Sequence, residues 1–219
     1  MKKKFLFYII ILFTSMLTSQ EVYVGTGLGS AIFDEYVNST GINTLDNAGF
    51  RKPKKALFEV GILFNLYKEK AKFDLGFNYN TYQINTSFYS GNLRIPTQYN
   101  LSYASAKAGF SAKLLRYKKL ILNIHSHYSY NWLTFGTNEY ADVFVDLVKD
   151  ETLDDTLWRF HRGFGLEYEI SDKISVYSNY DFATSFKENN EDSNSGEKYV
   201  LNTNAFTVGI LFEINKKNN

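Results

Sequence analysis

Cysteine is absent from the 219-residue chain, and its absence removes two classes of structure. Disulfide frameworks and thiolate metal sites both need cysteine, so neither is expected. Proline is nearly absent too, and the only two, Pro53 and Pro96, are expected to lie between strands. After residue 20 no apolar run approaches the length of a membrane-spanning helix, so residence in a membrane would have to depend on strands.

A marked excess of charge of either sign is also missing. The chain has 24 Lys and Arg against 23 Asp and Glu, a formal net charge of +1. Without Lys2, Lys3 and Lys4 the balance is 21 basic against 23 acidic residues, a net charge of −2. Such a balance gives no reason to expect a nucleic-acid partner.

The first 20 residues predict a secretory signal peptide. Lys2 to Lys4 form the basic region, Phe5 to Phe13 the apolar region, and Thr14 to Gln20 a small, polar region with cleavage near Ser19 or Gln20. The alternative is a membrane anchor, but the apolar region is too short for one. Residues 21–219 are therefore expected to form the mature domain.

Strict two-residue alternation organises the mature chain, most clearly from Ala56 to Tyr82. Because side chains alternate across a strand, each arm of this stretch has one apolar face and one polar face that contains glycine. Joined at the charged turn 68–70, the arms predict a hairpin in which apolar residues pair as Phe64/Phe73, Ile62/Leu75, Val60/Phe77 and Phe58/Tyr79, with Leu66 opposite Ala71. An alternating run of about eleven residues is long enough to cross a bilayer as a tilted strand.

Alternation recurs often enough to predict eight strands. They lie at about Val22–Phe33, Ala56–Tyr67, Ala71–Tyr82, Ser102–Leu115, Leu120–Trp132, Leu157–Ile170, Ile174–Phe182 and Phe206–Ile214. The connections alternate between short turns and long segments, and the long ones are Asp34–Lys55, Gln83–Asn100, Leu133–Thr156 and Ser185–Leu201. This pattern predicts an all-β fold, an eight-stranded antiparallel up-and-down transmembrane β-barrel, because an unpaired strand edge is unsatisfied in hydrocarbon.

The inward faces predict a lumen filled by side chains. They carry charges of nearly balanced sign, at Glu59, Lys72, Asp74, Lys107, Lys113, Arg159, Glu167, Glu169, Asp181 and Glu213. A barrel of eight strands is only wide enough to be filled by such groups, which would pair with one another. A narrow ion path is the alternative. Arg162 instead falls on the apolar parity, and we expect it near the outer interface.

Two further patterns were weighed as sites. The string Gly25-Thr26-Gly27-Leu28-Gly29 has serine where a dinucleotide fingerprint would continue, and no helix follows, so its glycines are expected to make room in the lumen. All three histidines, His125, His127 and His161, share the inward face. Pairing Trp132 with Trp158 as a trial register places Ser129 opposite His161. Imidazoles so placed could bind a metal or act as a general base for Ser126 or Ser129, but Ser126 has the wrong parity to face them. No catalytic, cofactor or metal residue is therefore predicted.

With these strands and connections, the chain resembles the small OmpA-type outer-membrane barrels and, among them, the PorT-like barrel domains. The resemblance extends over Glu21–Ile214. It implies the cell outer membrane as location, with outer-membrane lipids and lipopolysaccharide as neighbours. It also implies insertion by the barrel assembly machinery, for which Phe212 serves as the aromatic residue near the end of the chain.

The function expected from these features is structural, or binding of an envelope protein through the long loops, without enzymatic activity. Two alternatives remain open. One is a lipid A-modifying hydrolase, since small outer-membrane enzymes use His and Ser on this scaffold. The other is a secretion-machinery accessory barrel or a narrow channel.

Overall fold

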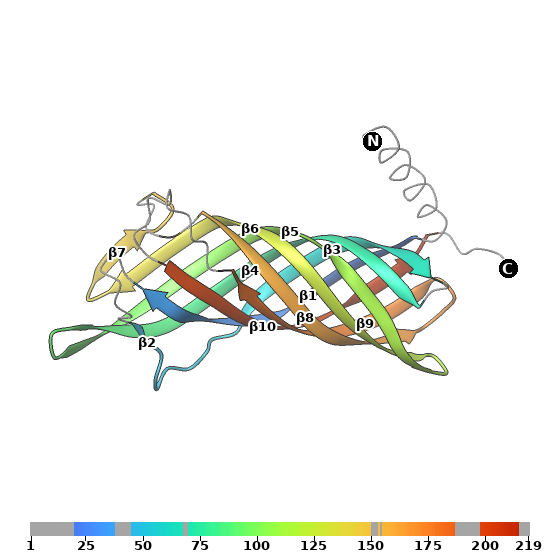
Figure 1. Cartoon of the computed structure of the whole chain (residues 1–219), viewed down its shortest axis with the longest axis horizontal. Helices are drawn as coiled ribbons and strands as arrows, with labels where there is room; N and C mark the ends of the chain where they lie inside the picture. The colour runs from blue at the N-terminus through green and yellow to red at the C-terminus, as the bar shows by residue number, and fades with distance from the viewer. Residues whose placement is uncertain are drawn as a thin grey trace, which may run out of the picture.

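The structure is a computed structural model that describes residues 20–37, 45–67, 70–149, 153, 155–186 and 198–214. No helix long and apolar enough to cross a membrane occurs among these residues. Ten strands are present in them (Figure 1): β1 Gln20–Val37, β2 Leu45–Asp46, β3 Lys55–Tyr67, β4 Ala71–Ser90, β5 Leu93–Tyr117, β6 Leu120–Tyr140, β7 Val143–Asp146, β8 Thr156–Glu169, β9 Ile174–Ser185 and β10 Lys198–Glu213.

Eight of these strands close into a ring. Their order is β4, β3, β1, β10, β9, β8, β6 and β5, and β5 pairs again with β4. Every pairing is antiparallel, and each strand of the ring is hydrogen-bonded on both sides. The predicted eight-stranded antiparallel barrel is therefore confirmed. Closure satisfies the backbone groups that an open sheet edge would leave without partners.

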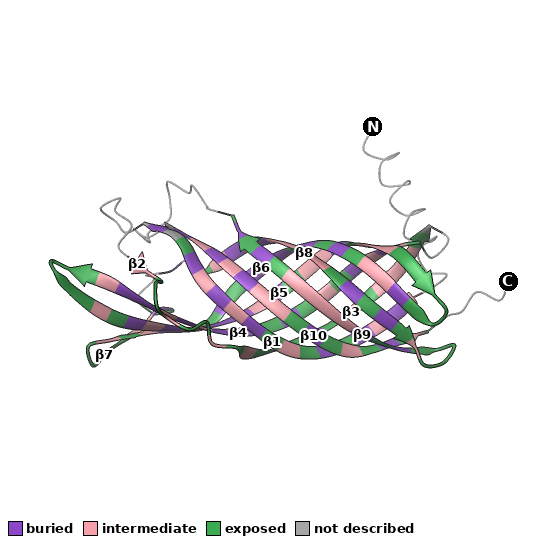
Figure 2. Cartoon of the chain, turned by 90° about the horizontal axis from the view of Figure 1, so that it is seen from below, coloured by how far each residue is buried: buried purple, intermediate pink, exposed green. Residues whose placement is uncertain are grey.

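The two faces of the wall differ as the alternation predicts. Exposed and buried residues alternate along the strands in Figure 2, and the outward positions are apolar. In the hairpin of β3 and β4 the four predicted apolar pairs are all present, from Phe58 opposite Tyr79 to Phe64 opposite Phe73. The turn differs: Tyr67, not Leu66, lies opposite Ala71, because the register shifts after Asn65. A bulge of this kind accommodates one extra residue before the turn.

Strands at one end of the barrel are much longer than predicted. The prediction of a long polar loop at Gln83–Asn100 was wrong, since β4 and β5 stay paired through this stretch up to Ser90 opposite Leu93. β6 likewise continues to Tyr140 and then pairs with β7, so much of the predicted long segment Leu133–Thr156 is strand. We call this end the loop end, and the end with the short connections near residues 70, 118 and 172 the turn end.

Beyond the ring, the extended strands form a small projecting sheet. It consists of β2, β7 and the loop-end parts of β4, β5 and β6, and we call it the blade; it projects at the left of Figures 1 and 2. Pro96 lies inside β5, so the prediction that it lies between strands was wrong. It pairs with Ser87 of β4 just beyond the last residue of β5 that pairs with β6, Thr97. Proline is tolerated there because one side of the strand needs no N–H donor.

Aromatic side chains gather on the outer face towards the loop end. Tyr130 contacts Trp158 and Trp132 with ring centroids 4.8 and 4.9 Å apart, and Tyr128 contacts Phe160 at 5.0 Å. Aromatic rings of this kind gather at the interface of a bilayer. Arg162 is exposed two residues beyond Phe160 on the same outer face, next to these rings. Its depth in the membrane stays a prediction.

Two predictions fall outside the described residues. The signal peptide at residues 1–20 lies outside them except for Gln20, which begins β1. Most of the polar segment Ser185–Leu201 lies outside as well. Only its ends are described, in β9 and β10.

Candidate functional site

The turn-end half of the lumen contains the predicted charge network. Lys72 Nζ lies 2.5 Å from Glu21 and 3.5 Å from Glu167, and all three side chains are buried. Deeper in the lumen, Lys107 Nζ lies 2.8 Å from Glu59 and 3.9 Å from Asp74. Because an unpaired buried charge is costly, these pairs compensate each lysine from two sides.

Inward glycines let long side chains lie flat across neighbouring strands. Gly209 and Gly25 stand side by side between Tyr177 and Glu59, and the Tyr177 hydroxyl crosses both to donate to Glu59 at 2.9 Å. A Cβ at Gly209 would meet the Tyr177 ring at 2.5 Å. The expectation that inward glycines make room for bulky neighbours is therefore confirmed at Gly25.

A second row is built the same way on the neighbouring strands β1, β3, β4 and β5. Gly61 and Gly76 stand between Tyr23 and Lys107, and the Tyr23 ring lies over both glycines. The Lys107 ammonium is 5.1 Å from the centre of that ring, and the Tyr23 hydroxyl donates to Asp74 at 2.9 Å. Each tyrosine thus reaches across two inward glycines that belong to neighbouring strands.

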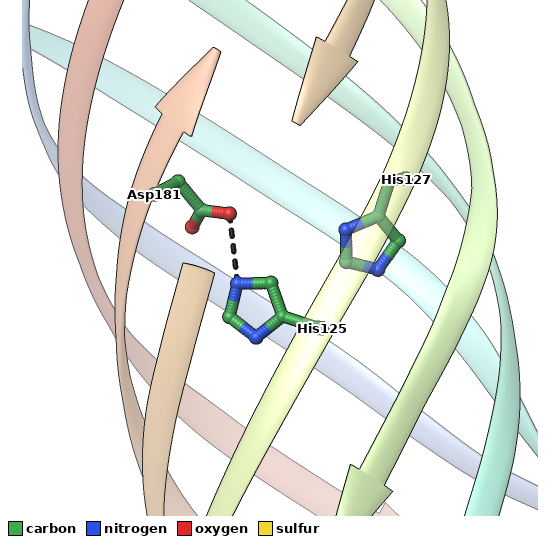
Figure 3. Close-up of side chains that lie close together, drawn as sticks. All are labelled: His125, His127 and Asp181. Carbon is green, nitrogen blue, oxygen red and sulfur yellow. Dashed lines mark hydrogen bonds and ion pairs between the residues drawn. The ribbon is translucent and has the colours of Figure 1, made fainter. Parts of the chain in front are cut away.

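Two histidine–aspartate pairs use single glycines in the same way. His125 and Asp181 flank Gly163, and the His125 Nε2 lies 2.8 Å from Asp181 Oδ1 across it (Figure 3). His127 and Asp74 flank Gly109, and the His127 Nε2 lies 2.8 Å from Asp74 Oδ2. The two imidazole rings are neighbours, with centroids 5.2 Å apart.

His161 lies beside this cluster but bonds elsewhere. The trial register of β6 and β8 was wrong by two residues, since Trp158 lies opposite Tyr130 and His161 lies opposite His127. Ser129 Oγ nevertheless reaches His161 Nε2 at 2.7 Å as a diagonal neighbour. A shift of two residues keeps every side chain on its predicted face. Ser126 is exposed on the outer face, as its parity predicts.

Little space is left among these groups. A cavity of about 70 Å³ lies in the centre of the lumen, with the two histidine–aspartate pairs in its wall. A smaller one of about 30 Å³ lies next to it towards the loop end, beside Arg159. Arg159 is only 1% exposed and hydrogen-bonds the Tyr82 hydroxyl at 3.2 Å and Thr203. These observations support the predicted filled lumen.

An apolar cluster fills the loop-end half of the lumen, and the sequence reasoning missed it. We call this cluster the plug; its buried members are Ala31, Phe33, Tyr36, Tyr82, Ile84, Tyr99, Leu101, Tyr103, Leu133, Leu147, Leu153, Leu157, Tyr199 and Leu201. Leu147 and Leu153 enter it from beyond the strands of the ring. One signal was available: the inward parity of β4 changes from polar residues to Tyr82 and Ile84.

The blade carries a groove on its surface. About 500 Å³ in volume, the groove is lined by Phe50, Tyr140, Phe144 and polar residues of β5 and β6. Arg94 holds the segment that carries Phe50 beside the groove. The Arg94 guanidinium donates to the Ala48 carbonyl at 2.6 Å and lies 5.1 Å from the centre of the Phe50 ring. Tyr140 and Phe144 both belong to the predicted long segment Leu133–Thr156.

Asp146 has a local role instead. Its Oδ1 accepts hydrogen bonds from the backbone of Val148 at 3.2 Å and Lys149 at 3.3 Å, which closes the turn after β7.

No protein-family model matches this sequence, and no curated protein matches it. Solved structures do match. Neisserial surface protein A has a TM-score of 0.51 at 11% identity, over 88% of this chain and 96% of that one. The attachment invasion locus protein of Yersinia pestis has a TM-score of 0.45 at 9% identity, over 90% and 99%. The outer membrane protein OprG from Pseudomonas aeruginosa has a TM-score of 0.46 at 8% identity, over 91% and 98%.

At such identities the likeness shows the fold alone. The closed ring, the exposed apolar belt and the filled lumen give the same result independently, because only a closed barrel satisfies its backbone in hydrocarbon. The chain is an eight-stranded transmembrane β-barrel of the outer-membrane type.

Proposed function

We propose that this barrel is a non-enzymatic binding protein that acts through its blade. The observation that carries the proposal is the combination of a plugged lumen and an ordered, partly apolar groove outside it. The outer face of the ring is committed to lipid and the lumen to packing, which leaves the loop end free to meet a partner. Phe144 is 64% exposed there, and exposed apolar groups rimmed by polar ones are typical of interaction sites.

The lipid A-modifying hydrolase is the alternative from another class. Such an enzyme needs a nucleophile and a base that both face the lipid. Ser126 faces outward while its neighbours His125 and His127 face the lumen, and the Ser129–His161 pair lies inside the wall. These positions favour the non-enzymatic function. Unchanged lipid A mass spectra in a deletion strain are expected, and a loss or gain of acyl chains would contradict it.

A channel or a secretion-machinery accessory barrel is the other alternative. The plug argues against conduction, because a water file would have to cross buried Phe33, Ile84 and Leu101, each at most 1% exposed. An accessory role differs from the proposed function only in the identity of the partner. It corresponds to the PorT-like resemblance, and it would be recognised by co-purification of secretion components.

Other neighbours of the barrel follow from its place in the membrane. Outer-membrane lipids and lipopolysaccharide would contact the exposed apolar belt, and the barrel assembly machinery would insert the chain. Phe212, which is exposed on the last strand, supports the contact with the barrel assembly machinery.

The test compares two equally exposed apolar residues of the blade. Phe144, in the groove, is 64% exposed, and Leu93, at the tip of the β4–β5 hairpin, is 66% exposed. Phe144→Ser should remove the partner recovered by cross-linking and affinity purification from outer membranes, and Leu93→Ser should retain it. Trimming residues 140–149 should have the same effect as Phe144→Ser. Survival of the full partner set in both cases would refute a binding role for the groove.

A further inference from the structure

Three metal-donor side chains converge in the lumen, away from the blade. His125 and His127 of β6 and Asp181 of β9 each offer a donor atom, and these atoms lie within 4.8 Å of one another (Figure 3). Two imidazoles and a carboxylate are the donor set that zinc and related first-row cations prefer, whereas magnesium and calcium prefer oxygen alone. We propose that this cluster binds a divalent transition-metal ion of the zinc class, which enters from the turn end of the barrel.

The geometry needs only a small adjustment to bind such an ion. In a tetrahedral site with bonds of about 2.0 to 2.1 Å, the donor atoms lie about 3.3 Å apart. His125 Nε2 and Asp181 Oδ1 are 2.8 Å apart, so these two atoms have to separate slightly while the His127 ring comes closer.

An orienting partner for His127 is already in place. Asp74 Oδ2 lies 2.8 Å from His127 Nε2, which leaves Nδ1 of this ring as the metal donor. A carboxylate that holds the second ring nitrogen is the common arrangement around metal-binding histidines, because it fixes both the tautomer and the ring direction. Asp74 is itself held by the Tyr23 hydroxyl.

Space for an ion lies directly beside the donors. The central cavity of about 70 Å³ is lined by all three of them, and it exceeds the volume that one water needs. Gly163 keeps this space open: a Cβ there would collide with His125 Nε2 and lie 3.1 Å from Asp181 Oδ1.

Charge also favours a cation at this place. Lys107 is the nearest ammonium in the cavity wall, and it is closer to Glu59, at 2.8 Å, than to Asp74, at 3.9 Å. Asp181 makes its hydrogen bond to His125 and has no lysine or arginine within salt-bridge distance among the described residues. A divalent ion would therefore add compensation for Asp74, which is buried, and for Asp181, which is partly buried.

In the described part of the chain, the central cavity adjoins an opening at the turn end. A mouth of about 240 Å³ opens at the turn end, and its wall shares Lys72, Lys113 and Glu167 with the wall of the central cavity. The ion pairs of Lys72 and other charged groups of both signs line this entrance beside a few apolar side chains such as Leu211, so a hydrated cation meets mostly polar groups on its way. The plug closes the opposite end.

The experiment uses the refolded barrel in detergent micelles. The protein is loaded with Zn²⁺, dialysed, and analysed by elemental mass spectrometry. Wild type should retain about one zinc ion per chain, as expected for a single site with three protein ligands. His125→Gln and Asp181→Asn should lose it, while Asp74→Asn, which removes only the orienting partner, should weaken affinity about 10- to 100-fold.

His161→Gln is the matched control, because it removes a neighbouring inward histidine outside the cluster and should leave retention unchanged. Folding of each variant is checked by the band shift of unboiled samples. X-ray absorption of zinc-loaded wild type provides a test that needs no variant, and it should show two imidazole ligands. Absence of retained zinc, retention in Asp181→Asn equal to wild type, or fewer than two imidazoles would each overturn the proposal and leave the histidines as members of the ion-pair network.

Discussion

Removal of Lys107 tests whether the luminal charges stabilise the barrel as compensated pairs. The ammonium lies 2.8 Å from Glu59 and 3.9 Å from Asp74, and its side chain is 9% exposed. Lys107→Met keeps the length of the side chain but leaves a buried carboxylate without its cation. Among the residues that the structure describes, Glu59 then retains the hydroxyl of Tyr177 as its side-chain donor, at 2.9 Å.

The magnitude follows from this geometry. Removal of one partner of a buried ion pair costs about 3 to 5 kcal/mol, whereas replacement of both partners by neutral groups is often close to neutral. We therefore expect Lys107→Met to lower the free energy of unfolding by about 3 to 5 kcal/mol. The double variant Glu59→Gln/Lys107→Met should recover most of this loss, because the glutamine oxygen still accepts from Tyr177.

Urea unfolding of the refolded barrel in lipid vesicles measures both effects. Lys119→Met is the control, since that lysine is exposed at the turn end and its substitution should change stability by less than about 0.5 kcal/mol. A loss below about 1 kcal/mol for Lys107→Met would mean that water compensates Glu59, and the filled-lumen reasoning would be refuted.

The wall makes three further predictions. Val60→Arg, at a lipid-facing position that is 48% exposed, should cost about 2 to 4 kcal/mol and reduce the folded band on unboiled gels. Asn78→Gln, on the inner face beside a cavity of about 30 Å³, should be tolerated. Gly209→Ala should destabilise by about 1 to 3 kcal/mol in urea unfolding, because its Cβ would meet a tyrosine ring; Gly29→Ala, whose nearest neighbours would be 3.3 and 3.4 Å away, should cost clearly less. Tyr177→Phe should cost about 1.5 to 3 kcal/mol by the same measurement, since it removes a hydrogen bond to a buried carboxylate, and no change would contradict the bond.

The sequence predicted the ring because the lipid-facing side of each strand has to be apolar, which produces a strict two-residue alternation. A slip of one residue would turn Phe58, Val60 and Ile62 into the lumen, so the register of β3 and β4 was predicted correctly up to the bulge after Asn65. A slip of two residues breaks no such rule, which explains the error between β6 and β8. The blade was missed for a related reason: outside the membrane no lipid requires an apolar face, and residues such as Tyr89 and Leu93 follow no strict alternation with the polar ones.

The candidate metal cluster could be predicted only in part. Parity placed His125, His127 and Asp181 on the inward face, which the structure confirms. Their convergence depends on the registers of β6 with β8 and of β8 with β9, and on a glycine between the pair in the middle strand. Alternation alone fixes neither register, so the sequence could not distinguish a metal cluster from three unrelated residues.

The two halves of the lumen differ in polarity, so the two ends of the barrel differ in what can enter them. Polar and charged groups line the turn-end half, where Lys72 and Lys107 each have two carboxylates in reach, so water and small ions can enter there at low cost. The plug fills the loop-end half with buried aromatic and aliphatic side chains, which exclude both. Arg159 lies at the boundary and meets the plug through the Tyr82 hydroxyl and ring, 3.2 Å and 5.5 Å away. Events at the blade and at the luminal cluster are therefore separated by an apolar barrier, and binding at one site need not open a path to the other.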